Sequence, residues 1–170
     1  MKRSLSTVFL LTLALTLALA QDNSKRPSPP AIAEASVDGV KIKIDYSAPS
    51  AKGRKMIGGI EPFGKVWRTG ANEATIFEID APIQVEGQVL AAGKYELFSI
   101  PGESEWTIIF QKYGKQWGAY DYKEANDVLR VKVKPAKSSA FVETFAIAVE
   151  KSQVTLQWEN TLIAFKIKKG

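Results

Sequence analysis

Short alternations of apolar and polar residues constrain this chain most. Between residues 40 and 46 apolar side chains fill every second position, and Lys41, Lys43 and Asp45 lie between them. Successive side chains of a strand point to opposite faces, so this period predicts a β-strand with one buried face. Similar segments occur at residues 75–79, 94–100, 106–110, 128–133, 141–149, 154–158 and 162–167.

Turn-forming residues separate these segments. The breaks fall at Asp38-Gly39, Glu86-Gly87, Pro101-Gly102, Lys112-Tyr113-Gly114 and Glu159-Asn160. No long segment keeps a helical period, and only residues 123–128 could supply one helical turn. Short strands with one polar face each predict an all-β fold, namely a single-domain antiparallel β-sandwich, jelly-roll-like or not. A closed barrel is the alternative.

The N-terminus has the features of a secretory signal peptide over residues 1–20. Lys2 and Arg3 precede an apolar run that ends in Ala18-Leu19-Ala20, a small-residue cleavage pattern. An uncleaved anchor helix is the alternative, although the run is short for a membrane span. We expect an exported protein, periplasmic or extracellular, with a proline-rich linker at 21–30, one domain at 31–170 and no later membrane segment.

Composition excludes several kinds of chemistry. The chain has neither histidine nor cysteine, so it lacks histidine and thiol catalysis, disulfides and the usual zinc ligands. No nucleotide-binding motif or nucleophile elbow is present, and we expect no cofactor and no metal. The acidic positions 121, 124 and 127 with Asn126 could hold calcium, but their spacing matches no known loop.

The basic residues are concentrated near the C-terminus. The net charge is +5, and from Arg130 onward eight basic residues face three acidic ones. Such a face could meet an anionic envelope surface, or its lysines could simply protect edge strands from aggregation. Nucleic-acid binding is not expected, because the chain has neither a basic helix nor an aromatic RNA-binding sheet pattern.

Residues 53–75 form the candidate functional segment. Their glycines and Pro62 exclude a continuous helix or strand, yet the segment is rich in polar and aromatic side chains. Arginines can grip an anion, and exposed aromatic rings can bind sugars. We therefore predict a site for a small polar or carbohydrate ligand at Arg54, Arg68, Asn72 and Glu73, with Trp67 and Trp117 as walls.

Three alternatives stay open for these residues. The arginines could instead hold the loop by pairing with Glu73 or with backbone carbonyls. Glu73 with Asp121 or Asp127 could form the carboxylate pair of a metal-independent hydrolase. The sequence favours a non-catalytic role without deciding whether the chain is an enzyme. Trp106 and Trp158 lie in regular strand patterns and are expected in the core.

Several segments together resemble a secreted bacterial family known as domain of unknown function 2911. The resemblance rests on Arg26-Pro27-Ser28-Pro29-Pro30, residues 46–54, the specific run Trp67-Arg68-Thr69-Gly70-Ala71-Asn72-Glu73 within residues 62–75, and residues 92–95, 106–110, 116–118 and 127–130. It covers nearly all of the chain after the signal peptide. It implies a secreted single domain and carries no established activity, substrate or catalytic residue.

Overall fold

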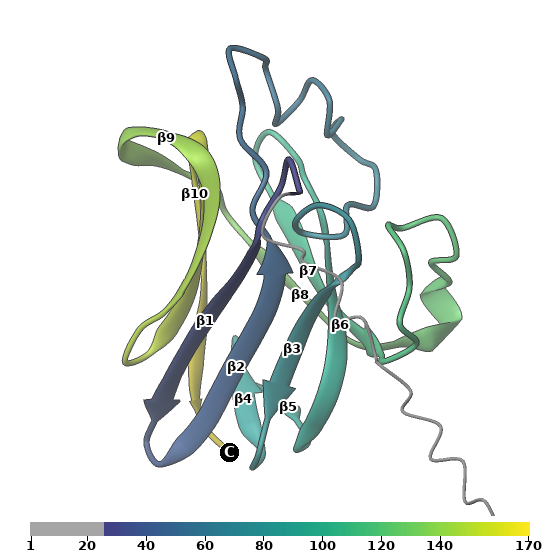
Figure 1. Ribbon diagram of the computed structural model, residues 1–170. Coiled ribbons are helices and arrows are strands. Elements are labelled where there is room, and N and C mark those ends of the chain that lie inside the picture. Colours follow the sequence, from purple (N-terminus) through teal and green to yellow (C-terminus); the bar gives the residue numbers. More distant parts are fainter. Residues whose placement is uncertain (1–25) are drawn as a thin grey trace, which may run out of the picture.

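The computed structural model describes residues 26–170 as two antiparallel β-sheets packed face to face (Figure 1). The first sheet has the order β1-β2-β3-β6-β7-β8, and the second has the order β5-β4-β10-β9. The strands are β1 (Pro30–Val37), β2 (Val40–Ser47), β3 (Thr75–Ile79), β4 (Ile83–Val85), β5 (Gln88–Leu90), β6 (Gly93–Ile100), β7 (Trp106–Lys112), β8 (Asp127–Val133), β9 (Ala136–Val149) and β10 (Gln153–Lys169). The predicted β-sandwich is confirmed, and the sheets do not close into a barrel.

The described residues do not include the predicted signal peptide, which stays a prediction. Within residues 26–170 no helix has the length and apolar character needed to cross a membrane. One 3-10 turn, η2 (Glu124–Asn126), lies within the single helical turn predicted at residues 123–128. The end of the predicted linker is attached to the domain, because the Pro29 carbonyl accepts a 2.9 Å hydrogen bond from the Ala48 N–H.

The core lies between the two sheets and follows the predicted alternation. Ile42, Ile44 and Phe77 of the first sheet are almost fully buried and meet Phe165 and Ile167 of the second. Inward side chains of two facing sheets interdigitate in this way in β-sandwiches. Because the chain has no cysteine, this apolar contact stabilises the fold without disulfides.

Two predicted turns have the conformation that favours tight hairpins. Asp38 and Gly39 have φ of +51° and +83°, and Glu86 and Gly87 have φ of +49° and +83°. Positive φ at both central residues matches the right-handed twist of the flanking strands. These turns join β1 to β2 and β4 to β5.

The sequence pattern predicts no strand at the positions of β1, β4 and β5. In β1 the inward face is occupied by Ala33 and Val37, while Ile32 points outward and is 60% exposed. Alanine has a low strand propensity, and an isoleucine on the exposed face interrupts the alternation of apolar and polar residues. β4 and β5 are three residues each, too short to show a period.

β10 reverses direction within its own length. Seventeen extended residues would span about 56 Å, yet the Ile167 N–H donates a 2.8 Å hydrogen bond to the Ser152 carbonyl. The reversal falls at Glu159, which has φ of +52°. The pairing of β10 with β9 shifts register on both sides of Glu159, so the segments predicted at 154–158 and 162–167 are two parts of one irregular strand and not two strands separated by a turn.

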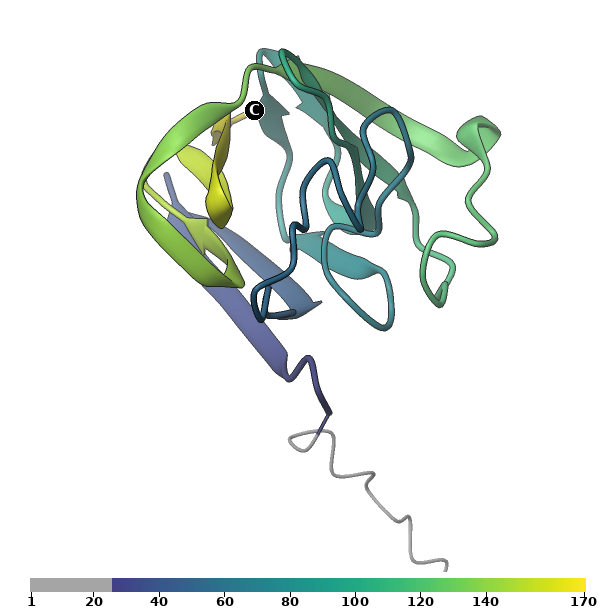
Figure 2. The same ribbon diagram turned by 90° about the horizontal axis from the view of Figure 1, so that it is seen from above.

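The irregular connection between β2 and β3, residues 48–74, lies across one end of the sandwich (Figure 2). Its Trp67 is only 2% exposed and stacks on Trp158, with ring centroids 5.7 Å apart and planes at 17°. Trp106 and Phe145 pack edge-on against the same ring at 6.3 Å and 5.1 Å. The void among these rings measures about 10 Å³, which leaves no room for an organic ligand in this part of the core.

Two carboxylates hold residues 48–74 against the second sheet. The two Glu159 oxygens accept hydrogen bonds from the N–H groups of Met56 at 3.1 Å and Ile57 at 2.9 Å. Glu143 Oε1 accepts one from the Lys52 N–H at 2.6 Å. Hydrogen bonds to a charged acceptor are stronger than neutral ones, so these contacts fix a segment that has few regular backbone pairs.

We predict that Trp67→Ala lowers the free energy of unfolding by about 3–5 kcal/mol, because it removes the centre of the aromatic cluster. Trp117→Ala is the matched control, since its side chain is 55% exposed and exposed substitutions usually change stability by less than about 0.5 kcal/mol. Urea denaturation of both variants measures the difference. Equal losses would contradict the role assigned to Trp67.

Candidate functional site

Two irregular segments cover the outer face of β6 and β7, opposite the sandwich core. Phe98 and Ile109 point to this outer face and are fully buried with Ala74 in a second apolar cluster. The covering residues come from residues 66–74 and from residues 113–126, the segment that projects beside the first sheet in Figure 1. Their burial of apolar area ties both segments to the sheet.

The two segments are joined to each other by backbone hydrogen bonds. The Gly118 N–H donates to the Asn72 carbonyl at 3.0 Å, and the Ala74 N–H donates to the Gln116 carbonyl at 3.0 Å. Glu73 and Trp117 therefore face each other as an isolated antiparallel bridge. The backbone of Trp117 is held as in a strand, while its indole stays 55% exposed.

A buried polar network fixes the second segment, residues 113–126, to β6 and β7. The Glu96 carboxylate is 0% exposed and accepts hydrogen bonds from the Gln116 N–H at 2.7 Å and from Gln116 Nε2 at 2.5 Å. Gln116 Nε2 also donates to Gln111 Oε1 at 2.6 Å. Both hydrogen atoms of the Gln116 side-chain amide are thus bonded, which holds this side chain in place. Gln116 Oε1 is buried and has no hydrogen-bond partner within residues 26–170.

The network continues to Asp127, where β8 begins. Gln111 Nε2 donates to Asp127 Oδ1 at 3.0 Å, and Asp127 Oδ2 accepts from the Tyr122 hydroxyl at 2.6 Å and from Arg130 Nε at 2.7 Å. Arg130 also pairs with Glu124 at 3.1 Å. These carboxylates are engaged internally, and residues 26–170 contain no cluster of three or more side chains suited to a metal ion.

The environment of Tyr122 raises the pKa of its hydroxyl to about 12. Burial contributes most, because it disfavours the phenolate, and the hydrogen bond to Asp127 adds to it. Arg130 acts in the opposite direction. The Tyr122 hydroxyl therefore stays neutral, and can donate a hydrogen bond, at pH values above the ordinary pKa of a tyrosine.

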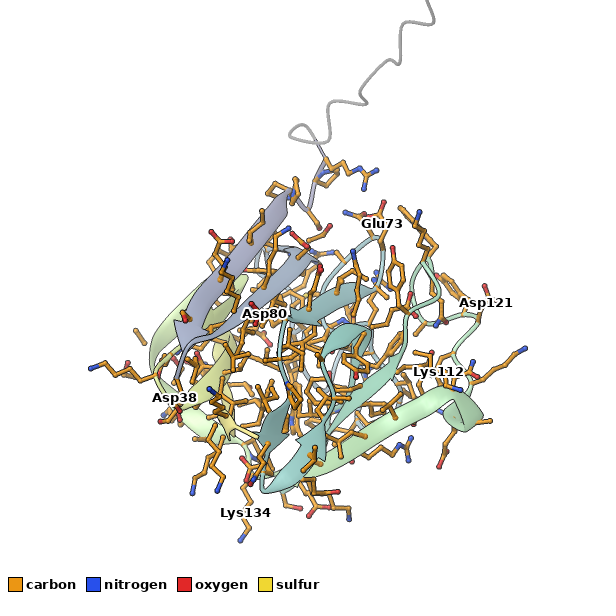
Figure 3. The ribbon with its side chains drawn as sticks, turned by 90° about the horizontal axis from the view of Figure 1, so that it is seen from below. Asp38, Glu73, Asp80, Lys112, Asp121 and Lys134 are labelled. Atoms are coloured by element: carbon orange, nitrogen blue, oxygen red, sulfur yellow. The ribbon has the colours of Figure 1, made fainter. Side chains whose placement is uncertain are left out.

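An open groove of about 600 Å³ lies on this second segment. Its polar and aromatic lining includes Lys112, Tyr113, Lys115, Gln116, Trp117, Asp121 and Lys123. Figure 3 shows Lys112 and Asp121 on the same side of the molecule. Only Trp117 and Asp121 of these residues were singled out from the sequence. The lysines gave no signal, because isolated lysines near turns normally lie on solvated faces.

Of the six predicted site residues, only Trp117 lines the groove. Arg54 folds back on its own loop, with Nε donating to the Ala51 carbonyl and Nη2 to the Ser50 carbonyl, both at 2.9 Å. This is the structural alternative that the sequence left open for the arginines. Trp67 belongs to the buried aromatic cluster and has no exposed face for a ligand.

Arg68 lies beside the second segment. A side-chain carbon added to Gly118 would be 3.6 Å from Arg68 Nη1. Arg68 Nε is buried and has no hydrogen-bond partner within residues 26–170. Burial raises the pKa of the Glu61 carboxyl, and the positive charge of Arg68 acts against that rise. The Arg68 guanidinium therefore lies next to Gly118, and it forms no ion pair with any residue of 26–170.

Asn72 and Glu73 bind the start of the described chain. Asn72 Nδ2 donates to the Ser28 carbonyl at 3.1 Å, and Arg26 Nη1 donates to both Glu73 oxygens at 2.9 Å. Burial favours a higher pKa for Glu73, but the bonds from Arg26 and from its own backbone N–H outweigh it and lower the pKa. Both side chains therefore anchor residues 26–28 beside the bridge to Trp117.

A family model described as "Protein of unknown function (DUF2911)" matches residues 28–167. The chain belongs to this family. The DUF2911 match spans both sheets, residues 48–74 and the groove, and it confirms the resemblance inferred from the sequence. Searches of curated proteins and of solved structures returned no match.

We predict that Tyr122 ionises near pH 12. Because its pKa in the folded chain lies above the unfolded value of about 10, its stabilising contribution is complete below about pH 10 and is lost as pH rises through about 12. In an ultraviolet absorbance titration, Tyr122→Phe should lose the absorbance change of one tyrosine near pH 12, whereas Tyr120→Phe should keep it; Tyr95, whose pKa burial also raises, is present in both variants. Loss of the change near pH 12 in Tyr120→Phe would contradict the assignment.

Proposed function

We propose that this protein is an exported binding protein whose open groove beside Trp117 holds a small polar or carbohydrate ligand. The observation that carries the proposal is an exposed tryptophan on a fixed backbone at a polar groove. Export is supported by the signal-peptide pattern of residues 1–20.

Trp117 differs from the other tryptophans of the chain. Trp67, Trp106 and Trp158 are each 2% exposed, whereas Trp117 is 55% exposed. A flat indole face next to water offers apolar area to the carbon face of a sugar ring, and its N–H is an additional donor. The bridge to Glu73 fixes the backbone of Trp117 at the groove.

The groove supplies the polar contacts that such a ligand needs. Its volume of about 600 Å³ lies within the roughly 300–1,000 Å³ typical of small-molecule sites. Lysine ammonium groups donate hydrogen bonds, the Asp121 carboxylate accepts them, and the Tyr113 hydroxyl does both. This combination suits a ligand with several hydroxyl groups.

The hydrogen bonds beneath the groove favour binding, because they order the groove before a ligand binds. Gln116 is fixed to Glu96 through both its backbone and its side chain, so the segment that carries Trp117 does not need to be ordered by the ligand. In this proposal Arg68, Asn72 and Glu73 act as supports of the site rather than as ligand contacts.

The carboxylates argue against the hydrolase alternative. Both Glu73 oxygens accept bonds from Arg26, and both Asp127 oxygens are bonded to neighbouring side chains. A glycosidase needs two carboxyl groups that face each other across the scissile bond. Asp121 alone lines the groove among the carboxylates considered for that role.

Tryptophan fluorescence tests the proposal, because acrylamide should quench Trp117 far more than its three buried counterparts. With the mature protein and a panel of neutral and acidic oligosaccharides, a bound sugar should protect Trp117 from quenching. Calorimetry should show binding about ten-fold or more weaker for Trp117→Ala, as for an aromatic anchor.

Phe141→Ala is the matched control, since Phe141 on β9 is 56% exposed and does not line the groove. It should leave the affinity unchanged. The proposal fails if no saccharide protects Trp117, or if the Phe141 variant weakens binding as much as the Trp117 variant.

A further inference from the structure

We infer that the groove selects acidic saccharides, with carboxylate-bearing sugars facing Lys112, Lys115 and Lys123 while a sugar ring packs on Trp117. This inference rests on the proposed function and names the class of its ligand. Its basis is the charge of the groove and the way in which neighbouring carboxylates are used.

The charged residues of the lining are unbalanced. Three lysines contribute positive charge and Asp121 alone contributes negative charge, which leaves an excess of +2. Within residues 26–170 none of these three lysines forms an ion pair, whereas Lys43, Lys94 and Lys132 do. A concave surface of one sign raises the local concentration of oppositely charged ligands.

Three carboxylates near the groove have bonding partners other than the lysines of its lining. Glu96 accepts two hydrogen bonds from Gln116. Asp127 and Glu124 pair with Arg130. None of these three carboxylates lines the groove, so Asp121 is the one acidic side chain among the lysines of its lining.

The lysines come from three separate places in the chain. Lys112 ends β7, Lys115 lies in the turn before Trp117, and Lys123 precedes η2. Lys115 has φ of +56°, a left-handed conformation that residues with a side-chain carbon seldom adopt. The neighbouring bonds from Gln116 to Glu96 hold this turn, so Lys115 is presented beside Trp117.

The ligand that fits these features is a sugar with both hydroxyl groups and a carboxylate. The indole supplies the apolar contact, Asp121 accepts hydrogen bonds from hydroxyls, and the ammonium groups pair with the carboxylates. A neutral sugar would leave the lysines without anionic partners. A simple inorganic anion would leave the indole without a contact.

Matched oligosaccharides test the inference. The panel pairs β-glucan, galactan and mannan oligomers with the same oligomers carrying carboxylates at the sixth carbon, and calorimetry on the mature protein measures each Kd. At least one acidic member should bind ten-fold or more tightly than its neutral partner. Its affinity should fall as salt rises, because salt screens exposed charges.

Charge variants supply the control. Lys115→Gln and Lys123→Gln should each weaken binding of the acidic sugar about five-fold, the upper range for an exposed ion pair, and leave the neutral sugar unaffected. Lys134→Gln removes the same charge from an exposed position that lies apart from Lys112 in Figure 3 and outside the groove. It should change neither Kd.

The outcomes separate this inference from the proposed function. Equal affinity for acidic and neutral partners, with Trp117 protected, would overturn the acidic preference and leave the binding function standing. An effect of Lys134→Gln as large as that of Lys115→Gln would also overturn it, because net charge rather than the groove would then be responsible. If no sugar protects Trp117, both proposals fail.

Discussion

The packing of Trp67 between the two sheets is the contact on which the rest of the structure depends. Its indole stacks on Trp158 and donates from Nε1 to the Gly70 carbonyl at 2.9 Å. Its backbone exchanges two hydrogen bonds with Ser99 of β6, at 2.7 and 2.9 Å. These contacts set the path of residues 68–74, which in turn hold the segment that carries Trp117. The groove thus inherits its geometry from the core.

Carboxylate side chains hold several segments of this chain, which has no cysteine, by accepting hydrogen bonds from backbone N–H groups. Glu159, Glu143, Glu96 and Glu86 each accept hydrogen bonds from backbone N–H groups of segments far away in the sequence. Such charge-assisted bonds satisfy the buried donors that irregular segments leave unpaired. The charged side chains that line the groove beside Trp117 are three lysines and Asp121.

The fold could be predicted largely from the sequence because period and turn chemistry act locally. The alternation of residues 40–46 and the Asp38-Gly39 turn carry their own signal, whereas the alanine-rich β1 does not. The site was less predictable, since it depends on contacts such as Gln116 with Glu96, twenty residues apart in the chain. The sequence predicts that Glu96 faces solvent on its strand, whereas in the structure residues 113–126 cover it.

The role of Gly70 could not be predicted from the sequence either. A glycine before Ala71-Asn72 suggests a positive φ, yet Thr69 and Asn72 have that conformation, at +55° and +59°. Gly70 is needed for close packing instead, since a side-chain carbon there would lie 3.0 Å from Thr75 Oγ1 and 3.1 Å from the Ser47 carbonyl oxygen.

Hydrogen exchange of the backbone amides tests the central claim, that these irregular segments form a rigid platform. The N–H groups of Trp67, Ala74 and Gly118 should exchange as slowly as those of the core strands, through large-scale unfolding. Exchange at the rate of an unstructured peptide, with the core strands still protected, would contradict the account.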